Sequence, residues 1–251
     1  MSPARALVRE PGKLFPRCIS SHPMRHTINV ERARSQHRAY CDTLSDLGLE
    51  VIHLPREDRF ADSCFIEDTA VIVGQKALIC RLAKPSRQGE EEAVELKLRE
   101  HRSTSRIIAP GTVEGGDVIH LQTNLICGIT QRTNKVGIQQ LEKFLEVPVE
   151  TIEISKVIHL KSHVTNLRQN TFVATKSMAQ QPALKGFEIL IIPDAEQYAA
   201  NTLTIGDTVL IPKGYPHTKS LIEKAGFTVV TLDMSEFAKC EGALTCLSLF
   251  F

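Results

Sequence analysis

The sequence has no marked excess of charge of either sign, since 30 lysines and arginines stand against 29 aspartates and glutamates. A chain this close to neutrality lacks the broad basic surface that recruits nucleic acids or anionic membranes. It also lacks an apolar run long enough to cross a bilayer, and its first ten residues lack the apolar core of a signal peptide. We therefore expect a cytoplasmic protein with neither a nucleic acid nor a membrane as its partner.

Cysteine motifs and linkers are missing as well. The seven cysteines are scattered without a Cys-x-x-Cys pair or the spacing of a zinc ribbon, so we predict no metal site. In a reducing compartment most of these cysteines are expected to be small buried hydrophobic residues. No stretch rich in proline, glycine or serine divides the 251 residues. We therefore predict one domain, residues 1–251, with a sizeable core.

The sequence does contain a repeated hairpin-like pattern, in which two β-branched runs flank a short polar turn. Three copies occupy residues 69–80, 117–128 and 201–212, and a weaker fourth lies around residues 171–175. A helical pattern follows each of the three, at residues 91–100, 137–144 and 218–225, and a short strand follows each helix, at residues 106–109, 149–154 and 227–232. Residues 30–47 and 49–54 add a helix and a strand that fit the same scheme.

This unit of strand, strand, helix and strand, with a period near 50 residues, predicts a closed array of about five units. The expected fold is an α/β propeller with its helices outside; an ordinary α+β domain with hairpins is the alternative. In a ring, equivalent loops meet at one central channel. Arg87 and Arg132 follow the first and second hairpins, so both could hold one carboxylate. Without the ring they would be two solvated surface arginines.

Acidic side chains gather at two places along the chain. Asp62, Glu67 and Asp68 surround an apolar stretch before the first hairpin, where they could clamp the planar guanidinium group. A solvated turn is the alternative. Glu114 stands directly before Gly115 and Gly116, and glycines let a backbone approach a ligand closely. The neighbouring acids favour a cation over a phosphate at this second place.

Two further residues complete a possible reaction centre. His159 lies among apolar residues. Taken alone, this position favours a histidine that packs in the core over a catalytic histidine. Cys246 stands five residues before the C-terminus, after a turn that contains glycine. Together, a thiol, an imidazole, several carboxylates and two arginines suggest attack by a thiolate on an electron-poor carbon. A molecule with a cationic end and a carboxylate end, such as arginine or a derivative, fits this set.

These motifs resemble the dimethylarginine dimethylaminohydrolase family of the pentein, or guanidine-modifying, superfamily. The resemblance covers nearly the whole chain and is carried in order by residues 60–68, 112–117, 132–134, 159–161 and 244–248. It implies a five-fold pseudo-symmetric α/β propeller with the active site in its central channel. It also implies hydrolysis of N-methylated arginines to citrulline and dimethylamine or methylamine, through a covalent cysteine thiouronium intermediate.

The resemblance also implies a role for each motif residue. Cys246 would be the nucleophile, His159 the general acid and base, and Glu114 the residue that orients His159. Substrate binding would fall to Asp68 and Glu114 at the guanidinium, with Glu67 supporting this acidic cluster, to Asp62 and the backbone carbonyl of Cys240 at the α-amino group, and to Arg87 and Arg132 at the α-carboxylate. Residues 18–24 would form a mobile lid. No metal or organic cofactor is expected.

Cys240 departs from the family pattern, which has an aliphatic residue six positions before the nucleophile. The hypothesis that follows is a disulfide between Cys240 and Cys246 that inhibits the enzyme. Two other functions stay open at this point. One is an arginine deiminase or another guanidine hydrolase, and the other is a non-catalytic propeller that binds a macromolecular partner. A homodimer is also left open.

Overall fold

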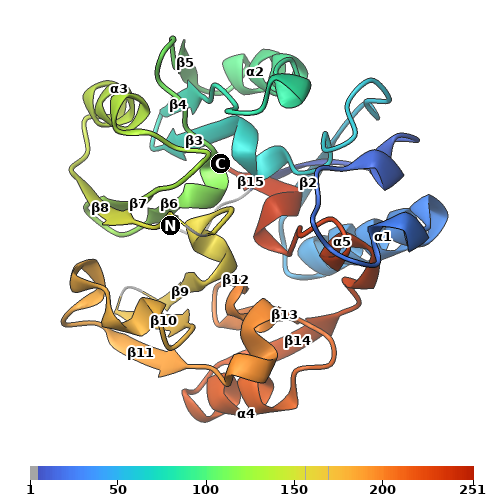
Figure 1. Cartoon of the computed structure of the whole chain (residues 1–251), viewed down its shortest axis with the longest axis vertical. Helices are drawn as coiled ribbons and strands as arrows, with labels where there is room; N and C mark the ends of the chain where they lie inside the picture. The colour runs from blue at the N-terminus through green and yellow to red at the C-terminus, as the bar shows by residue number, and fades with distance from the viewer. Residues whose placement is uncertain (1–4, 156, 169) are drawn as a thin grey trace.

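The computed structural model describes residues 5–155, 157–168 and 170–251, which form five three-stranded sheets around a common axis (Figure 1). The sheet orders are β15-β1-β2, β3-β4-β5, β6-β7-β8, β9-β10-β11 and β12-β13-β14. In every sheet the first strand is antiparallel to the middle one, and the third is parallel to it. The predicted five-fold α/β propeller is therefore confirmed.

The elements have the following bounds. The strands are β1 (Arg5–Arg9), β2 (Glu50–Leu54), β3 (Ala70–Val73), β4 (Lys76–Ile79), β5 (Ser103–Arg106), β6 (Val118–His120), β7 (Leu125–Ile129), β8 (Val149–Glu153), β9 (Val164–Arg168), β10 (Thr171–Ala174), β11 (Glu188–Ile191), β12 (Leu203–Ile205), β13 (Thr208–Pro212), β14 (Thr228–Leu232) and β15 (Ser248–Phe250). The α-helices are α1 (Val30–Asp46), α2 (Glu92–Arg99), α3 (Lys135–Leu145), α4 (Pro216–Lys224) and α5 (Ser235–Ala238).

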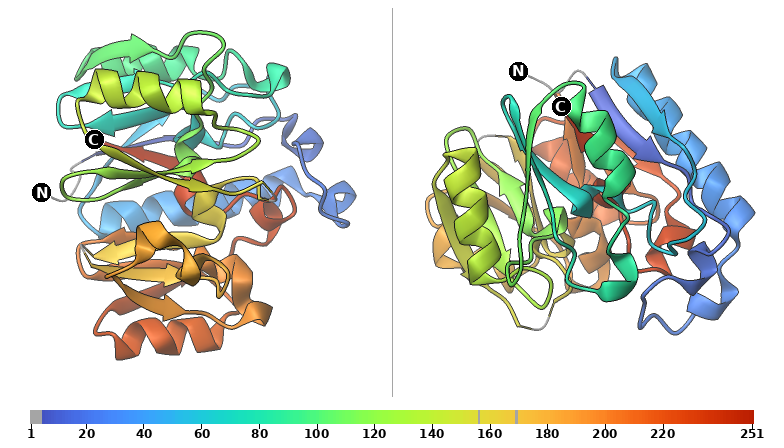
Figure 2. Two further views of the ribbon diagram at one scale, coloured as in Figure 1. Left: turned by 60° about the vertical axis from the view of Figure 1, so that its left-hand side comes forward. Right: turned by 90° about the horizontal axis from the view of Figure 1, so that it is seen from above.

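The first sheet closes the ring, because it joins the two ends of the chain. β1 pairs with β15 in antiparallel register, with Ala6 opposite Phe250, and with β2 in parallel register. Figure 2 shows both termini on one side of the molecule, while the dark blue segment after β1 lies on the other side. The chain thus returns to its starting point, and the segments that follow β1 and precede β15 meet.

Helices α1 to α4 each connect the middle strand of a sheet to its outer strand and lie on the outside of the ring, as predicted (Figures 1 and 2). The short helix α5 lies between β14 and β15 and so connects two sheets. The Asn29 and Asn134 side chains cap α1 and α3 by accepting the backbone N–H groups of Arg32 and Gly137. The fourth repeat has two 3-10 turns, Met178–Gln180 and Pro182–Leu184, in place of a long helix. This difference explains why its sequence pattern is the weakest of the copies.

One predicted strand was misplaced. β5 comprises Ser103–Arg106, whereas the sequence pattern indicated residues 106–109. The apolar pair Ile107 and Ile108 placed the expected strand too late in the chain, because β5 itself is the polar run Ser-Thr-Ser-Arg. Arg106 ends the ladder with β4, and Ile107 adds one further backbone hydrogen bond to the carbonyl of Ile79.

Buried apolar clusters fill the spaces between neighbouring sheets and the outer helices. Along the axis lies a cavity of about 1390 Å³, lined by residues of the first strand of every sheet. Glu67, Lys161 and Thr245 also line this cavity. No helix in the described part of the chain is long and apolar enough to cross a membrane.

Candidate active site

The candidate residues lie in equivalent places of different repeats. A 3-10 turn precedes the first strand of each sheet, with at most two residues between them: Ile66–Thr69 before β3, Gly115–Asp117 before β6, Leu160–Ser162 before β9, Asp194–Ala200 before β12 and Thr245–Leu247 before β15. Asp68 and Cys246 lie within two of these turns, and Glu114 and His159 directly precede two others. The ring therefore brings together residues that are far apart in the sequence. Glu67 and Thr245, for example, are 178 positions apart and share a hydrogen bond.

His159 is held by two buried carboxylates. Its Nε2 atom lies 2.7 Å from Oε2 of Glu114 and 3.6 Å from Oδ1 of Asp68. Burial lowers the pKa of His159, but Asp68 and Glu114, with Asp117 nearby, outweigh it and raise the pKa to about 9. The imidazole is therefore protonated at neutral pH, which makes it a ready proton donor.

Asp117 supports this histidine, although sequence reasoning did not include it among the site residues. Its carboxylate accepts the backbone N–H of Leu160 at 2.9 Å and the Thr130 hydroxyl at 2.8 Å. Asp117 thereby fixes the turn that begins directly after His159. The sequence signal was present, because Asp117 closes the same Glu-Gly-Gly-Asp motif that supplies Glu114.

Gly115 and Gly116 leave room for other groups of the site itself, whereas the sequence suggested close approach of the backbone to a ligand. A Cβ atom on Gly116 would lie 2.8 Å from the His159 ring and 3.0 Å from the Asp68 carboxylate. A Cβ atom on Gly115 would lie 2.0 Å from the backbone carbonyl oxygen of Glu67. The glycine pair is thus required for the carboxylates and the imidazole to approach one another.

Arg87 is buried and fully engaged with acids, so it is not a solvated surface residue. Its guanidinium donates to Asp68 at 2.8 Å and to Glu90 at 2.9 Å, and it lies 3.7 Å from Glu114. These acids hold the Arg87 pKa well above its usual value against the effect of burial. Glu90 was not foreseen as a site residue, although its place three positions after Arg87 was visible in the sequence.

Arg132 approaches the same acidic centre from the next repeat. The residue is buried, and its Nη1 atom lies 3.5 Å from Oε1 of Glu114. The two arginines therefore converge from corresponding loops, as the repeat pattern predicted. In the described structure, the group on which they converge is the Glu114 carboxylate.

Asp68 is a buried acid of the cluster with both a side-chain and a backbone donor. It accepts the backbone N–H of Gly116 at 3.0 Å in addition to the Arg87 guanidinium. Burial raises its pKa, but His159 and Arg87 outweigh this and lower it to about 2. The carboxylate is therefore ionised at any physiological pH and is available to a cation.

Glu67 and its neighbours join the site to the axial cavity. Glu67 forms an ion pair with Lys161 and accepts the Thr245 hydroxyl at 2.8 Å. The Asn201 side chain in turn donates to the Lys161 carbonyl and the Thr245 hydroxyl, and it accepts the Thr245 N–H, each at 3.0 Å. Asn201 thus links the turn after His159 to the turn that carries Cys246.

Cys246 is partly buried and has no disulfide partner. Burial raises the pKa of its thiol to about 12, and the Glu67 and Asp68 carboxylates reinforce this effect. The thiol is therefore neutral in the free protein. A cation placed against the same carboxylates would lower the thiol pKa and favour the thiolate.

Asp62 and Cys240 each contact the segment of residues 18–24, the expected lid. The Asp62 carboxylate is buried and accepts the backbone N–H of Ile19 at 3.2 and 3.3 Å. Burial raises its pKa, and Arg87 opposes the shift.

Cys240 is bonded to Cys18, so the hypothesis of a disulfide between Cys240 and Cys246 is wrong for this structure. The ring brings Cys18, 222 positions away in the sequence, against Cys240 instead.

Asp68, Glu114 and His159 also offer three potential metal-ligand atoms within 4.8 Å of one another. Arg87 and Arg132 already lie against the two carboxylates of this trio. The charge that a metal ion would balance is therefore largely balanced by the protein. The absence of a metal site and of a cofactor stays a prediction.

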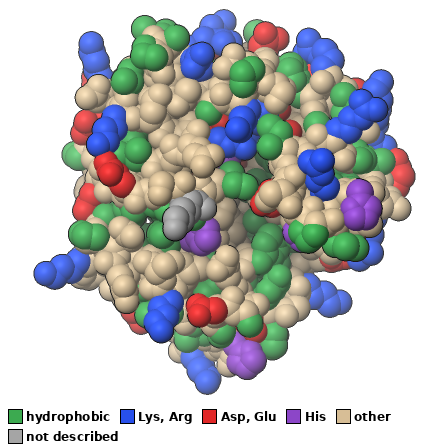
Figure 3. All heavy atoms as spheres, viewed as in Figure 1, with side chains coloured by type: hydrophobic (Ala, Val, Ile, Leu, Met, Phe, Trp, Pro, Cys, Tyr) green, Lys and Arg blue, Asp and Glu red, His purple; other side chains and the backbone are tan. Residues whose placement is uncertain are grey.

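Residues 18–24 and the 3-10 turns that precede β3 and β15 lie toward one face of the ring, which Figures 1 and 3 view from the front. The surface in Figure 3 is hollowed near its centre, and most lysine and arginine side chains lie toward the rim. Cys246, His159, Glu114 and Asp68 do not line the axial cavity, which Glu67 and Lys161 border. The ion pair between those two residues thus stands between the cavity and the candidate site.

Comparisons with known proteins agree with this arrangement. The model of the arginine deiminase family matches residues 58–196. The dimethylarginine dimethylaminohydrolase of Pseudomonas aeruginosa is 35% identical over 225 residues, which are 88% of this chain and 89% of that enzyme. The enzyme of the same name from Streptomyces coelicolor is 33% identical over 253 residues, with 99% and 97% covered.

A solved structure extends the similarity to three dimensions. A cysteine-to-serine variant of the Pseudomonas aeruginosa enzyme, in complex with citrulline, matches with a TM-score of 0.96 and 32% identity over 100% of both chains. The sequence identity and the five-fold ring agree with these relatives. The chain belongs to the arginine deiminase family and, within it, to the dimethylarginine dimethylaminohydrolases.

Proposed function

We propose that this protein is a hydrolase that converts N-methylated arginines to citrulline and dimethylamine or methylamine, with Cys246 as its nucleophile. The observation that carries the proposal is that equivalent turns of the ring bring His159 against the Glu114 and Asp68 carboxylates, and bring the Cys246 thiol close enough to Asp68 for that carboxylate to raise its pKa. Relatives named dimethylarginine dimethylaminohydrolase, at 35% and 33% identity, support the substrate class. The citrulline complex of such a relative supports the product.

Each charge of a methylarginine has a partner of opposite sign in the proposed site. Asp68 and Glu114 take the guanidinium group, with Glu67 behind them, and Asp62 and the Cys240 carbonyl take the α-amino group. Arg132 and Arg87 take the α-carboxylate. Arg87 is already bound to Asp68 and Glu90, so its main contribution is to hold those two carboxylates in place. Arg132, with one long contact at 3.5 Å, is the freer of the two.

The substrate itself activates the nucleophile in this proposal. The neutral Cys246 thiol has a pKa of about 12 because it is buried beside two carboxylates. A bound guanidinium neutralises those carboxylates and favours the thiolate, which attacks the electron-poor guanidinium carbon. The protonated His159 then gives its proton to the departing amine, which leaves a thiouronium on Cys246.

Hydrolysis of the thiouronium returns the enzyme to its starting state. His159, now neutral, takes a proton from a water molecule, and the water oxygen attacks the same carbon. The bond to sulfur breaks, and the products are citrulline and the Cys246 thiol. Glu114 holds the imidazole in place through both halves, since its carboxylate lies 2.7 Å from Nε2.

The test is a product assay with three substrates and two variants. Purified protein is mixed with arginine, monomethylarginine or asymmetric dimethylarginine, and both citrulline and the released amine are measured. Citrulline with methylamine or dimethylamine, absent from Cys246→Ser but present in Cys41→Ala, is the expected result. Cys41 is a suitable matched control because it is a free thiol buried on the outer helix α1.

Other outcomes of that assay would replace the proposal. Citrulline mainly from unmethylated arginine would indicate an arginine deiminase. No turnover of any of the three by folded protein with a free Cys246 would indicate another guanidine substrate or a non-catalytic propeller.

We also propose that the chain works as a single catalytic unit in the cytoplasm. The homodimer stays a prediction, which sedimentation velocity can decide.

A further inference from the structure

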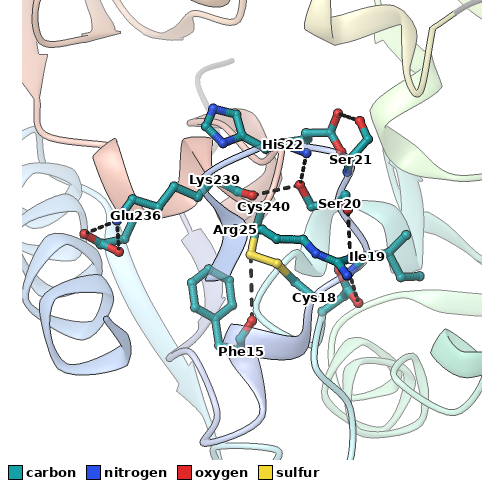
Figure 4. The surroundings of a disulfide bond; sticks show 12 residues. Phe15, Cys18, Ile19, Ser20, Ser21, His22, Arg25, Glu236, Lys239 and Cys240 are labelled. Carbon is teal, nitrogen blue, oxygen red and sulfur yellow. Dashed lines mark hydrogen bonds and ion pairs between the residues drawn. A yellow bond between two sulfur atoms is a disulfide. The ribbon is translucent and has the colours of Figure 1, made fainter. Parts of the chain in front are cut away.

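Residues 18–24, the expected lid, are bonded to the segment of residues 239–241. The Ser20 hydroxyl donates to the Lys239 carbonyl at 2.8 Å. The N–H and hydroxyl of Ser21 both donate to the Glu241 carboxylate, each at 2.8 Å. Figure 4 shows these two segments side by side, with the sulfur bridge between Cys18 and Cys240 below them.

The disulfide is the buried part of this contact. Cys18 and Cys240 are each 3% exposed, whereas residue 21 and residues 23–27 are exposed to solvent. Solvent-exposed hydrogen bonds compete with water and hold a loop only weakly. The covalent bond is therefore the firmest link between the lid and the rest of the molecule.

This link acts directly on the predicted subsite for the α-amino group. Ile19 follows Cys18, and its backbone N–H binds both oxygens of the Asp62 carboxylate. On the other side, Cys240 supplies the carbonyl that is expected to bind the same amino group. One disulfide thus fixes the positions of both proposed partners of that group.

The segment that carries Cys240 also leads to the nucleophile. It follows α5 and precedes the turn Thr245–Leu247 that contains Cys246. Tyr198 holds this connection from the opposite side, because its hydroxyl donates to the Gly242 carbonyl at 2.7 Å. A change at Cys240 is therefore expected to move the lid and the amino subsite more than the nucleophile.

We propose that the Cys18–Cys240 disulfide is a positioning element of the α-amino subsite, and that its reduction weakens substrate binding without disabling the chemistry. The inference rests on the function proposed above. Neither cysteine touches the reacting atoms. Both act through the Ile19 N–H, the Asp62 carboxylate and the Cys240 carbonyl.

The redox step needs a dithiol as its reductant. A thiolate of the dithiol attacks one sulfur of the Cys18–Cys240 bond and forms a mixed disulfide, and its second thiol then closes a cyclic disulfide. The dithiol loses two electrons and two protons, and Cys18 and Cys240 gain them as two thiols. A small disulfide oxidant reverses the exchange. Because both sulfurs are buried, the reductant reaches them when the lid opens.

The first arm of the test compares oxidised protein with protein treated with dithiothreitol. Alkylation after denaturation counts five free thiols in the oxidised form and seven in the reduced form. Reduction is expected to raise KM for asymmetric dimethylarginine about tenfold, the scale of one charge-assisted hydrogen bond, and to change kcat less than about twofold. KM for the analogue without the α-amino group is expected to stay nearly constant.

Variants separate this effect from a general response to reductant. Cys18→Ser and Cys240→Ser should have the raised KM from the start and should not respond to dithiothreitol. Cys41→Ala keeps the disulfide and should respond as the wild type does. An equal KM in the oxidised and reduced forms, or an equal rise for both substrates, would overturn the proposal.

A second arm needs no turnover and separates this inference from the proposed function. The amide hydrogens of Ile19 and Ser21, which bind acidic side chains, should exchange with solvent at least about tenfold faster after reduction. Unchanged exchange rates after reduction would overturn the proposal that the disulfide holds residues 18–24 in place. Faster exchange in a protein that forms no citrulline in either redox state would support this role of the disulfide and refute the proposed function.

Discussion

At the residue scale, the site is a balance of buried charges in which each acid faces a nitrogen. Glu114 illustrates this, because burial raises its pKa but His159 and Arg87 overcome that effect and lower it. Its two oxygens accept from His159 and from the backbone N–H of Ala83. The site's protonation therefore depends on each member of the cluster.

We predict that Glu114→Gln lowers kcat at least about tenfold, because a neutral amide no longer stabilises the protonated imidazole. His159 has a pKa of about 9 partly because of Glu114, so removal of that charge lowers the pKa. As the pH is raised, kcat of the variant should therefore begin to fall at a lower pH than kcat of the wild type. A profile that keeps its position would show that Glu114 does not set the state of His159.

We predict that Gly116→Ala abolishes most activity while the protein stays folded. The added methyl group would lie 2.8 Å from the His159 ring, so the imidazole or the turn must move. Circular dichroism and the citrulline assay measure the two effects separately. Gly74→Asn is a matched control, since Gly74 has a φ of 55° with open space around it and asparagine tolerates that conformation. Full activity of Gly116→Ala would contradict the account.

At the element scale, the 3-10 turns before the first strands position the site. Asn201 lies just after one such turn, Asp194–Ala200, and bonds to the two turns that hold His159 and Cys246. A side chain from one repeat thus sets the distance between catalytic groups in two others.

We predict that Asn201→Leu lowers kcat about tenfold or more, with a much smaller change in KM, because it removes three hydrogen bonds that align the turns. Asn166→Ala is the control, since Asn166 also donates to a carbonyl, that of His120, but at an exposed position. A rise in KM without loss of kcat would place Asn201 in substrate binding instead.

Several elements could be predicted from sequence, and the reasons others could not are physical. The hairpins β3–β4, β6–β7 and β12–β13 were visible because β-branched runs flank short turns. The helix α1 was visible because Ala33, His37, Tyr40 and Leu44 recur on one buried face. The fourth repeat was faint because it lacks a long helix, and β5 was misplaced because its own residues are polar and the apolar Ile107 and Ile108 follow it.

At the scale of the whole molecule, ring closure decides which distant residues meet. The sequence motifs identified the acids, the imidazole and the thiol, because these residue types stand out beside glycines and strands. The role of Asn201 and the bond from Cys18 to Cys240 could not be inferred from the local sequence. Their contacts exist because β1 and β15 share one sheet and because neighbouring repeats pack side by side.

The buried cluster should also link stability to pH. The pKa of His159 is raised from 6.5 to about 9 on folding, so its contribution is complete below pH 6.5 and is lost as the pH rises through 9. The free energy of unfolding, measured in urea, should therefore fall over that interval. His159→Gln should reduce the slope. An unchanged slope would mean that His159 is not protonated in the folded protein.

The central claim is that Cys246 attacks the guanidinium carbon of a methylated arginine, and acid quenching followed by mass spectrometry tests it most directly. Wild-type protein is mixed with asymmetric dimethylarginine, quenched within a turnover, digested and compared with Cys246→Ser. We predict a thiouronium adduct on the peptide that contains Cys246, together with release of dimethylamine, and neither in the variant. Citrulline formed without an adduct, with the adduct on another residue, or by Cys246→Ser at the wild-type rate would contradict the account.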